Sequence, residues 1–160
     1  MKITAFIVVV LGADWSMAAS AQVVEKTTLT LAGAKRIAAA AEQTARDQGA
    51  RVVIAVVDEG GNLLLLERLD DTQVASVQVG IDKARTAAIY RRPSRVFEDQ
   101  VRNGRVSALA LHGAVALQGG IPILVEDKVV GAIGVSGETP GQDEEIALAG
   151  ASVAASFSKP

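Results

Sequence analysis

The chain has 160 residues, a formal net charge of −2, no cysteine and a single histidine. This length predicts one domain with a sizeable core, and the charge balance provides no basic surface for nucleic acid. Without cysteine, the chain can form no disulfide, thiolate metal site or thiol nucleophile. A single histidine also excludes a zinc site built from two histidines.

Residues 1–21 have the pattern of a secretory signal peptide. Lys2 supplies a positive charge, an apolar stretch runs from Ile3 to Ala13, and Ala19-Ser20-Ala21 is a small-residue cleavage site. The apolar stretch is too short to span a bilayer, so we expect no stable membrane insertion, although a retained amphiphilic anchor is the alternative. Cleavage after Ala21 would leave residues 22–160 as a single periplasmic or secreted domain.

The first half of this domain predicts one helix and one β-hairpin. A helix is expected over residues 30–48, with Thr30 as its N-cap. The run 51–58 is apolar and rich in β-branched residues, which is typical of a central strand covered on both faces. A tight turn at 59–62 leads to a partner strand over 63–68.

Two further helices are expected next. The second helix begins at Asp71 or Thr72 and continues to about Tyr90, and Ser94 then caps a third, shorter helix through Val101. Residues 105–117 predict a helical turn plus a loop. The buried stripe of the second helix is predicted from its apolar spacing to be Val74, Val77, Ile81, Ala84 and Ala88.

A second hairpin spans Gln118–Gly137, with its turn at residues 126–128. Its second strand has one face of shrinking side chains, because strands alternate with a period of two. Glycine within a strand weakens it unless something must approach closely, such as a packed helix, a neighbouring subunit or a flat ligand. That face is predicted to consist of Val130, Ala132, Gly134 and Ser136.

Thr139 with Pro140 and Gln142 predicts the N-terminus of a last helix. The expected order is therefore α-β-β-α-α-β-β-α. Two hairpins joined through helices imply an α+β fold, in which helices pack on a central antiparallel sheet.

Several motifs resemble the GlcG/HbpS family, the DUF336 group, which includes the C-terminal domain of some PduO-type proteins. They are LTLAGA at 29–34, VVDEGGNLLLLERLDD at 56–71, KARTAA at 83–88, and QGGIPI with VVGAIGVSG at 118–123 and 129–137. The resemblance implies a compact sandwich, assembly into homo-oligomers and, for several secreted members, haem binding. Other members are intracellular and have different roles.

If haem binds, His112 is the candidate axial ligand of its iron, and Tyr90 is the other conventional ligand left once residues 1–21 are removed. His112 also precedes the Gly119-Gly120 pair beside the small-residue strand, where a planar ring could enter. The alternative is a core or helix-end histidine bonded to a carbonyl.

Lys83 and Tyr90 fall on one side of the second helix, where they could meet the propionates and the edge of a macrocycle. The alternative is a solvated face, and it applies to Thr86 as well. Arg68 could pair with a ligand carboxylate or form a surface ion pair with Asp70. The predicted binding set is His112, Tyr90, Lys83, Arg68, Gly119, Gly120, Gly134 and Ser136.

Acidic residues 143–145 are explained by the dipole of the last helix and predict no metal site. We therefore expect a periplasmic or secreted protein that binds haem or another planar tetrapyrrole. The alternative is a small enzyme acting on an organic acid or a reactive catabolic intermediate, with Lys83, His112 or Asp70 in acid–base roles. In either case homo-oligomers are expected.

Overall fold

The computed structural model describes residues 22–157, so the predicted signal peptide lies outside the described residues. Four α-helices, two short 3-10 helices and four strands follow one another along this range. They are α1 (Leu31–Asp47), β1 (Val53–Asp58), β2 (Leu63–Arg68), α2 (Ser76–Tyr90), α3 (Arg95–Arg102), η1 (Val106–Ala110), β3 (Gly120–Val125), β4 (Lys128–Ser136), α4 (Pro140–Ser152) and η2 (Val153–Ser156).

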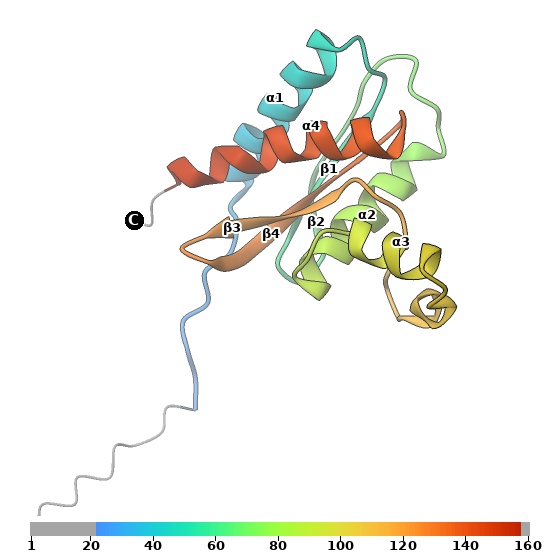
Figure 1. Cartoon of the computed structure of the whole chain (residues 1–160). Coiled ribbons are helices and arrows are strands. Elements are labelled where there is room, and N and C mark those ends of the chain that lie inside the picture. Colours follow the sequence, from blue (N-terminus) through green and yellow to red (C-terminus); the bar gives the residue numbers. More distant parts are fainter. Residues whose placement is uncertain (1–21, 158–160) are drawn as a thin grey trace, which may run out of the picture.

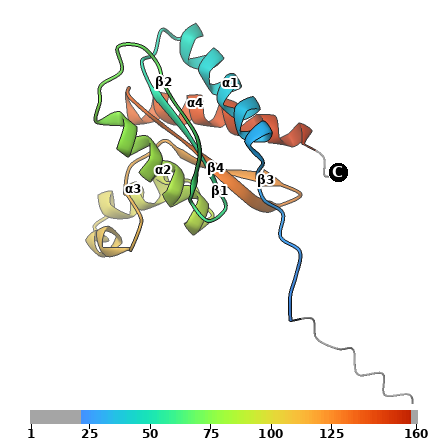
Figure 2. The same cartoon turned by 180° about the vertical axis from the view of Figure 1, so that it is seen from behind.

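The four strands form one antiparallel sheet in the order β2-β1-β4-β3. Helices α1 and α4 cover one face of this sheet, while α2 covers the other and α3 follows it (Figures 1 and 2). The predicted α+β fold and the predicted order of helices and strands are confirmed. The two hairpins, β1–β2 and β3–β4, meet through the pairing of β1 with β4.

Local chemistry defines several of these boundaries. The side chain of Thr30 accepts a hydrogen bond from the Gly33 amide at 3.1 Å and caps α1. Thr139 accepts from the Gln142 amide and caps α4. Ser94, in contrast, does not cap α3, because its hydroxyl donates to the Leu117 carbonyl and accepts from the Gly120 amide.

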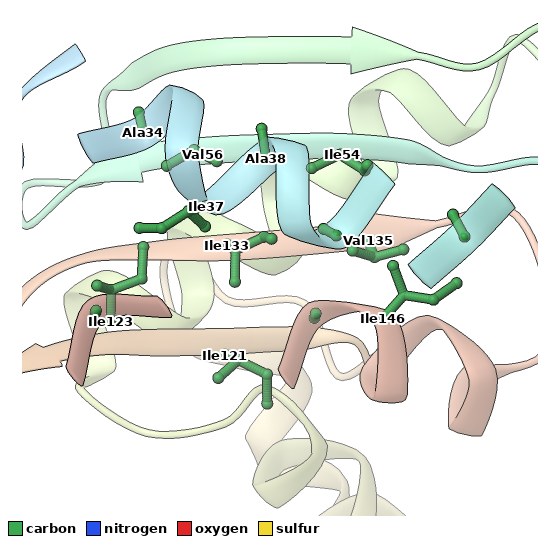
Figure 3. Packing of buried hydrophobic residues seen from close by; sticks show 14 of the residues in the cluster. Ala34, Ile37, Ala38, Ile54, Val56, Ile121, Ile123, Ile133, Val135 and Ile146 are labelled. Atoms are coloured by element: carbon green, nitrogen blue, oxygen red, sulfur yellow. The ribbon is translucent and has the colours of Figure 1, made fainter. Parts of the chain in front are cut away.

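The larger core lies between the sheet and the α1–α4 layer. Figure 3 shows isoleucines and valines of β1 and β4 beneath alanines and Ile37 of α1, and beside Ile146 of α4. Residues 53–57 of β1 are all fully buried. Because successive side chains of a strand point to opposite faces, this burial confirms a central strand covered on both faces.

The second face of the sheet is lined by small residues. Its buried cluster consists of Ala55, Val57, Ala84, Ala87, Ala88 and Ala132. Helix α2 therefore approaches β4 very closely: a Cβ added at Gly80 would meet Val53 Cγ1 at 3.2 Å and the Gly134 carbonyl oxygen at 3.7 Å.

Two details of the predicted pattern are wrong. Helix α2 begins at Ser76 rather than at Asp71 or Thr72, and Val74, predicted to be buried, is 75% exposed. Apart from Lys83, the helix buries small residues, because these allow its backbone to approach β4 closely. Its buried residues are Ser76, Gly80, Lys83, Ala84, Thr86, Ala87 and Ala88.

Val130 was expected on the face of Ala132 and Gly134, but it lies in the α1–α4 core with Ile133 and Val135. The pairing of β3 with β4 shifts between Ile123 and Leu124, which leaves one extra residue in β4. Such an irregularity interrupts the period of two and moves a side chain to the opposite face.

Over residues 22–157, no helix is both long enough and apolar enough to cross a membrane.

Candidate functional site

The small-residue face of β4 is occupied by the protein itself. A Cβ added at Gly134 would lie 2.2 Å from the Gly80 carbonyl oxygen, and one added at Gly120 would lie 2.2 Å from the Lys83 carbonyl oxygen. Of the three interpretations of this face, the packed helix is therefore the one the structure shows. Because α2 packs directly against this face of β4, no space for a planar ring remains between them.

Lys83 is not on a solvated face. Its side chain is buried, and its Nζ donates to Asp143 Oδ2 at 2.7 Å and to the Val135 carbonyl at 3.0 Å. Thr86 is also fully buried, donating to the Asp82 carbonyl and accepting from the Val115 amide. With its ammonium held in this way, Lys83 is not placed to meet the propionates of a surface ligand.

Asp143 does more than interact with a helix dipole. Its side chain is buried against Lys83, and its Oδ1 accepts from the Glu138 amide at 3.0 Å. Burial raises the pKa of the Asp143 carboxyl above its ordinary value, opposed by the hydrogen bond from Lys83 and the one from the Glu138 backbone. The pair joins α2 to α4 around the end of β4.

A cavity of about 240 Å³ lies beside this pair. It is surrounded by the end of β4, the residues that precede β3, the first half of α2, the first turn of α4 and Glu98 of α3. Its polar lining includes Ser76, Lys83, Glu98, Ser136, Glu138 and Asp143. We call it the Lys83 cavity.

His112 lies on the loop after η1 and is exposed. The Tyr90 hydroxyl donates to the His112 carbonyl at 2.8 Å, and the Tyr90 ring packs edge-on against Phe97 with a centroid distance of 5.0 Å. The imidazole itself makes no hydrogen bond or ion pair with the rest of the described chain. His112 is thus not a core histidine, and its side chain is available to a ligand.

Large apolar side chains around His112 face solvent. Val106 is 67% exposed, Leu109 64% and Leu117 44%, and Ile89 at the end of α2 is 39% exposed. A Cβ at Gly113 would lie 3.2 Å from Ile89 Cδ1, so this loop runs along the end of α2. We call this region, defined by Ile89, Val106, Leu109, His112 and Leu117, the His112 surface.

The remaining candidates lie apart from both sites. Arg68 ends β2 and is exposed, and no ion pair links it to Asp70 or to another described residue. No hydrogen bond or ion pair connects Lys83, His112 and Asp70, the three residues of the enzyme hypothesis. In the described range 22–157, no group of three or more acidic or histidine side chains could hold a metal ion.

A second cavity, of about 310 Å³, lies near the start of α1 and the C-terminal residues. Leu29, Val125, Val130 and Phe157 give it an apolar lining, and the Arg36 guanidinium lies 4.8 Å from the centroid of the Phe157 ring. No histidine or tyrosine lines it, so it offers no conventional ligand for haem iron.

Sequence reasoning brought together Lys83, Gly119, Gly120 and Ser136, which do lie close to one another. It missed Asp143 as the partner of Lys83 and Ser76 as a neighbour in the same cavity. Gly119 is close enough to Lys83 that an added Cβ would lie 2.9 Å from Nζ. The available signal was the position of Lys83 beside Ala84 and Ala87, within a stripe of small residues that must face the sheet.

The fold is a single α+β sandwich with a buried lysine–aspartate pair at the end of its central hairpin. The chain belongs to the HbpS-like family, whose model is described as "Haem degrading protein HbpS-like" and matches residues 29–152. Protein GlcG of Escherichia coli strain K12 is 40% identical over 111 residues, which cover 69% of this chain and 83% of that protein.

Solved structures agree with this assignment. Klebsiella pneumoniae protein ORFY, of the DUF336 family, superposes with a TM-score of 0.81 and 30% identity, covering 87% of this chain and 99% of that one. HbpS superposes with a TM-score of 0.76 and 32% identity, covering 82% of this chain and 94% of that one. The predicted family membership is confirmed.

Proposed function

We propose that this chain is a periplasmic or secreted protein that binds haem, or a closely related planar tetrapyrrole, at the His112 surface. The observation that carries the proposal is an exposed imidazole, without a partner in the described chain, among exposed apolar side chains. An exposed apolar surface of this kind is typical of a binding site, and histidine is the most common axial ligand of haem iron.

The residues present fit such a ligand. His112 would hold the iron, and Leu109 and Leu117 would cover apolar parts of the macrocycle. Tyr90 acts as a positioning residue, because its hydroxyl already holds the His112 carbonyl. Arg92, whose Nε donates to the Tyr90 carbonyl at 3.1 Å, is a cation next to this surface that could pair with a propionate.

Two further observations support the proposal. The family description names haem degradation, which requires that haem be bound. Residues 1–21 carry the pattern of a signal peptide, which supports a location outside the cytoplasm.

Titration of residues 22–160 with hemin, followed by absorbance, tests the proposal. We expect a shifted Soret band that saturates at one hemin per chain. The His112→Ala variant should change the band position or bind hemin more weakly. Leu109→Ala should also weaken binding, whereas Leu124→Ala, which shortens an apolar side chain of β3 that is 50% exposed, serves as the matched control. An unchanged spectrum with stoichiometric hemin, or equal effects of the two leucine variants, would contradict the proposal.

A further inference from the structure

The Lys83 cavity contains polar side chains that are almost completely buried yet incompletely hydrogen-bonded. Ser76 is 1% exposed, and its Oγ has no partner in the described chain. A buried hydroxyl without a partner loses the hydrogen bonds that it made to water, which is unfavourable unless something else supplies them. The cavity beside Ser76 is where such a partner can bind.

Two more donors lie around the same space. Ser136 is 6% exposed, and its hydroxyl makes no hydrogen bond with any described residue. The Lys83 ammonium has three N–H groups, of which two are used by Asp143 and the Val135 carbonyl. Ser76, Ser136 and Lys83 can therefore donate together to a ligand rich in oxygen atoms.

The charge of the lining decides which ligands are favoured. Glu98, Glu138 and Asp143 contribute three carboxylates; Glu98 is ion-paired with Arg102 and Asp143 with Lys83, so the carboxylate of Glu138 is left without an ion pair among residues 22–157. The carboxylates disfavour an anion by like-charge repulsion. A ligand hydroxyl group can donate a hydrogen bond to a carboxylate and accept one from the Lys83 ammonium or a serine hydroxyl.

We propose that the Lys83 cavity binds a small neutral polyhydroxy compound, with Ser76 and Lys83 as its principal hydrogen-bonding partners. Its volume of about 240 Å³ is below the range of roughly 300–1,000 Å³ that is typical of sites for drug-sized ligands. The ligand is therefore smaller than a drug or a haem.

Leu117 of the His112 surface also lines the Lys83 cavity, but the polar groups of the two sites lie at opposite ends of α2. Ser76 is the first residue of α2 and Tyr90 the last, so about 20 Å of helix lies between them at 1.5 Å per residue. Hemin binding and binding in the Lys83 cavity can thus succeed or fail independently.

The test is a titration of ¹⁵N-labelled residues 22–160, followed by NMR, with glycerol as the neutral probe and lactate as an anion of similar size. We expect glycerol to cause saturable shifts of the amides around the cavity, including those of Ser76 and Glu138, at millimolar concentration. Lactate should bind more weakly. Shifts that are spread over the whole chain and remain linear with glycerol concentration would overturn the proposal, as would tighter binding of lactate.

Ser76→Ala is the decisive variant. Its fold should be retained, because the hydroxyl that it removes has no partner in the described chain. Loss of one ligand hydrogen bond should weaken glycerol binding roughly two- to tenfold. Ser107→Ala, at an exposed position of η1 outside the cavity, is the matched control and should bind as the parent chain does. Equal affinity of the Ser76 and Ser107 variants for glycerol would overturn the assignment of Ser76.

Discussion

Replacement of Lys83 by methionine tests the buried pair that joins α2 to α4. Methionine is similar in length and fills the space of the alkyl chain, but it cannot donate to Asp143 or to the Val135 carbonyl. The substitution therefore leaves the Asp143 carboxylate buried without a side-chain partner, held only by hydrogen bonds from the backbone of Gly137 and Glu138. Removal of one partner from a buried ion pair typically costs about 3–5 kcal/mol.

For a chain of this size, each kcal/mol lowers the melting temperature by about 2–4 °C. Lys83→Met should thus melt roughly 6–20 °C below the parent chain in a thermal unfolding experiment followed by circular dichroism. Lys35→Met, at an exposed position of α1, is the matched control, and its unfolding free energy should change by less than about 0.5 kcal/mol.

The loss of stability in Lys83→Met should decrease as the pH falls. Burial raises the pKa of Asp143 in the folded chain above the ordinary value of an aspartate. The folded state therefore binds this proton more tightly than the unfolded state, so the stability that the group contributes is present at low pH and is lost as pH rises through the raised pKa. Without Lys83 this pKa rises further, because the hydrogen bond and charge that lower it are gone.

The deficit of Lys83→Met relative to Lys35→Met should consequently be largest at neutral pH and shrink as the pH falls toward the range in which Asp143 is protonated. Addition of Asp143→Asn to Lys83→Met should recover part of the stability, since it removes the unpaired charge and keeps an oxygen for the Glu138 amide. Equal melting temperatures of the two methionine variants at neutral pH, or a deficit that does not change with pH, would refute this reasoning.

Two further predictions concern packing and assembly. Gly134→Ala should lower the melting temperature strongly, because the added Cβ would lie 2.2 Å from the Gly80 carbonyl oxygen. Gly141→Ala is the control and should not lower it, since its added Cβ would contact no neighbouring side chain or backbone within 4 Å. Similar melting temperatures of the two variants would contradict the close approach of α2 to β4. Light scattering of residues 22–160 at micromolar concentration should give the mass of a homo-oligomer; a monomeric mass would contradict this expectation.

Patterns that act over short distances were predicted well. The N-caps Thr30 and Thr139 and the fully buried run of β1 lie in the structure where the sequence places them. Each depends on neighbours within a few residues: a hydroxyl reaches an amide three positions on, and a strand alternates with a period of two. The α+β class followed from their order along the chain.

The binding site was predicted less completely. The small side chains of β4 were correctly identified as a place of close approach, but three candidate occupants remained open. The sequence shows that the side chains on this face are small, but it does not show which group packs against them. The carbonyl of Gly80 beside Gly134 decides this point in favour of α2. Val130 lies on the opposite face from the one predicted, because the shift in the pairing of β3 with β4 depends on both strands and cannot be read from β4 alone.

By itself, the sequence determined the family, the order of helices and strands and the candidate ligand His112, since these follow from local spacing and from motifs in a fixed order. Tertiary structure alone decided that Lys83 is paired with Asp143, 60 positions away, and that Ser76 lies beside them with its hydroxyl unpartnered in the described chain. Charge and hydrogen-bonding partners that are distant in the chain meet only when α2 and α4 pack around the end of β4. Whether a polar side chain is buried, and which groups lie within hydrogen-bonding distance of it, therefore depends on how these elements pack.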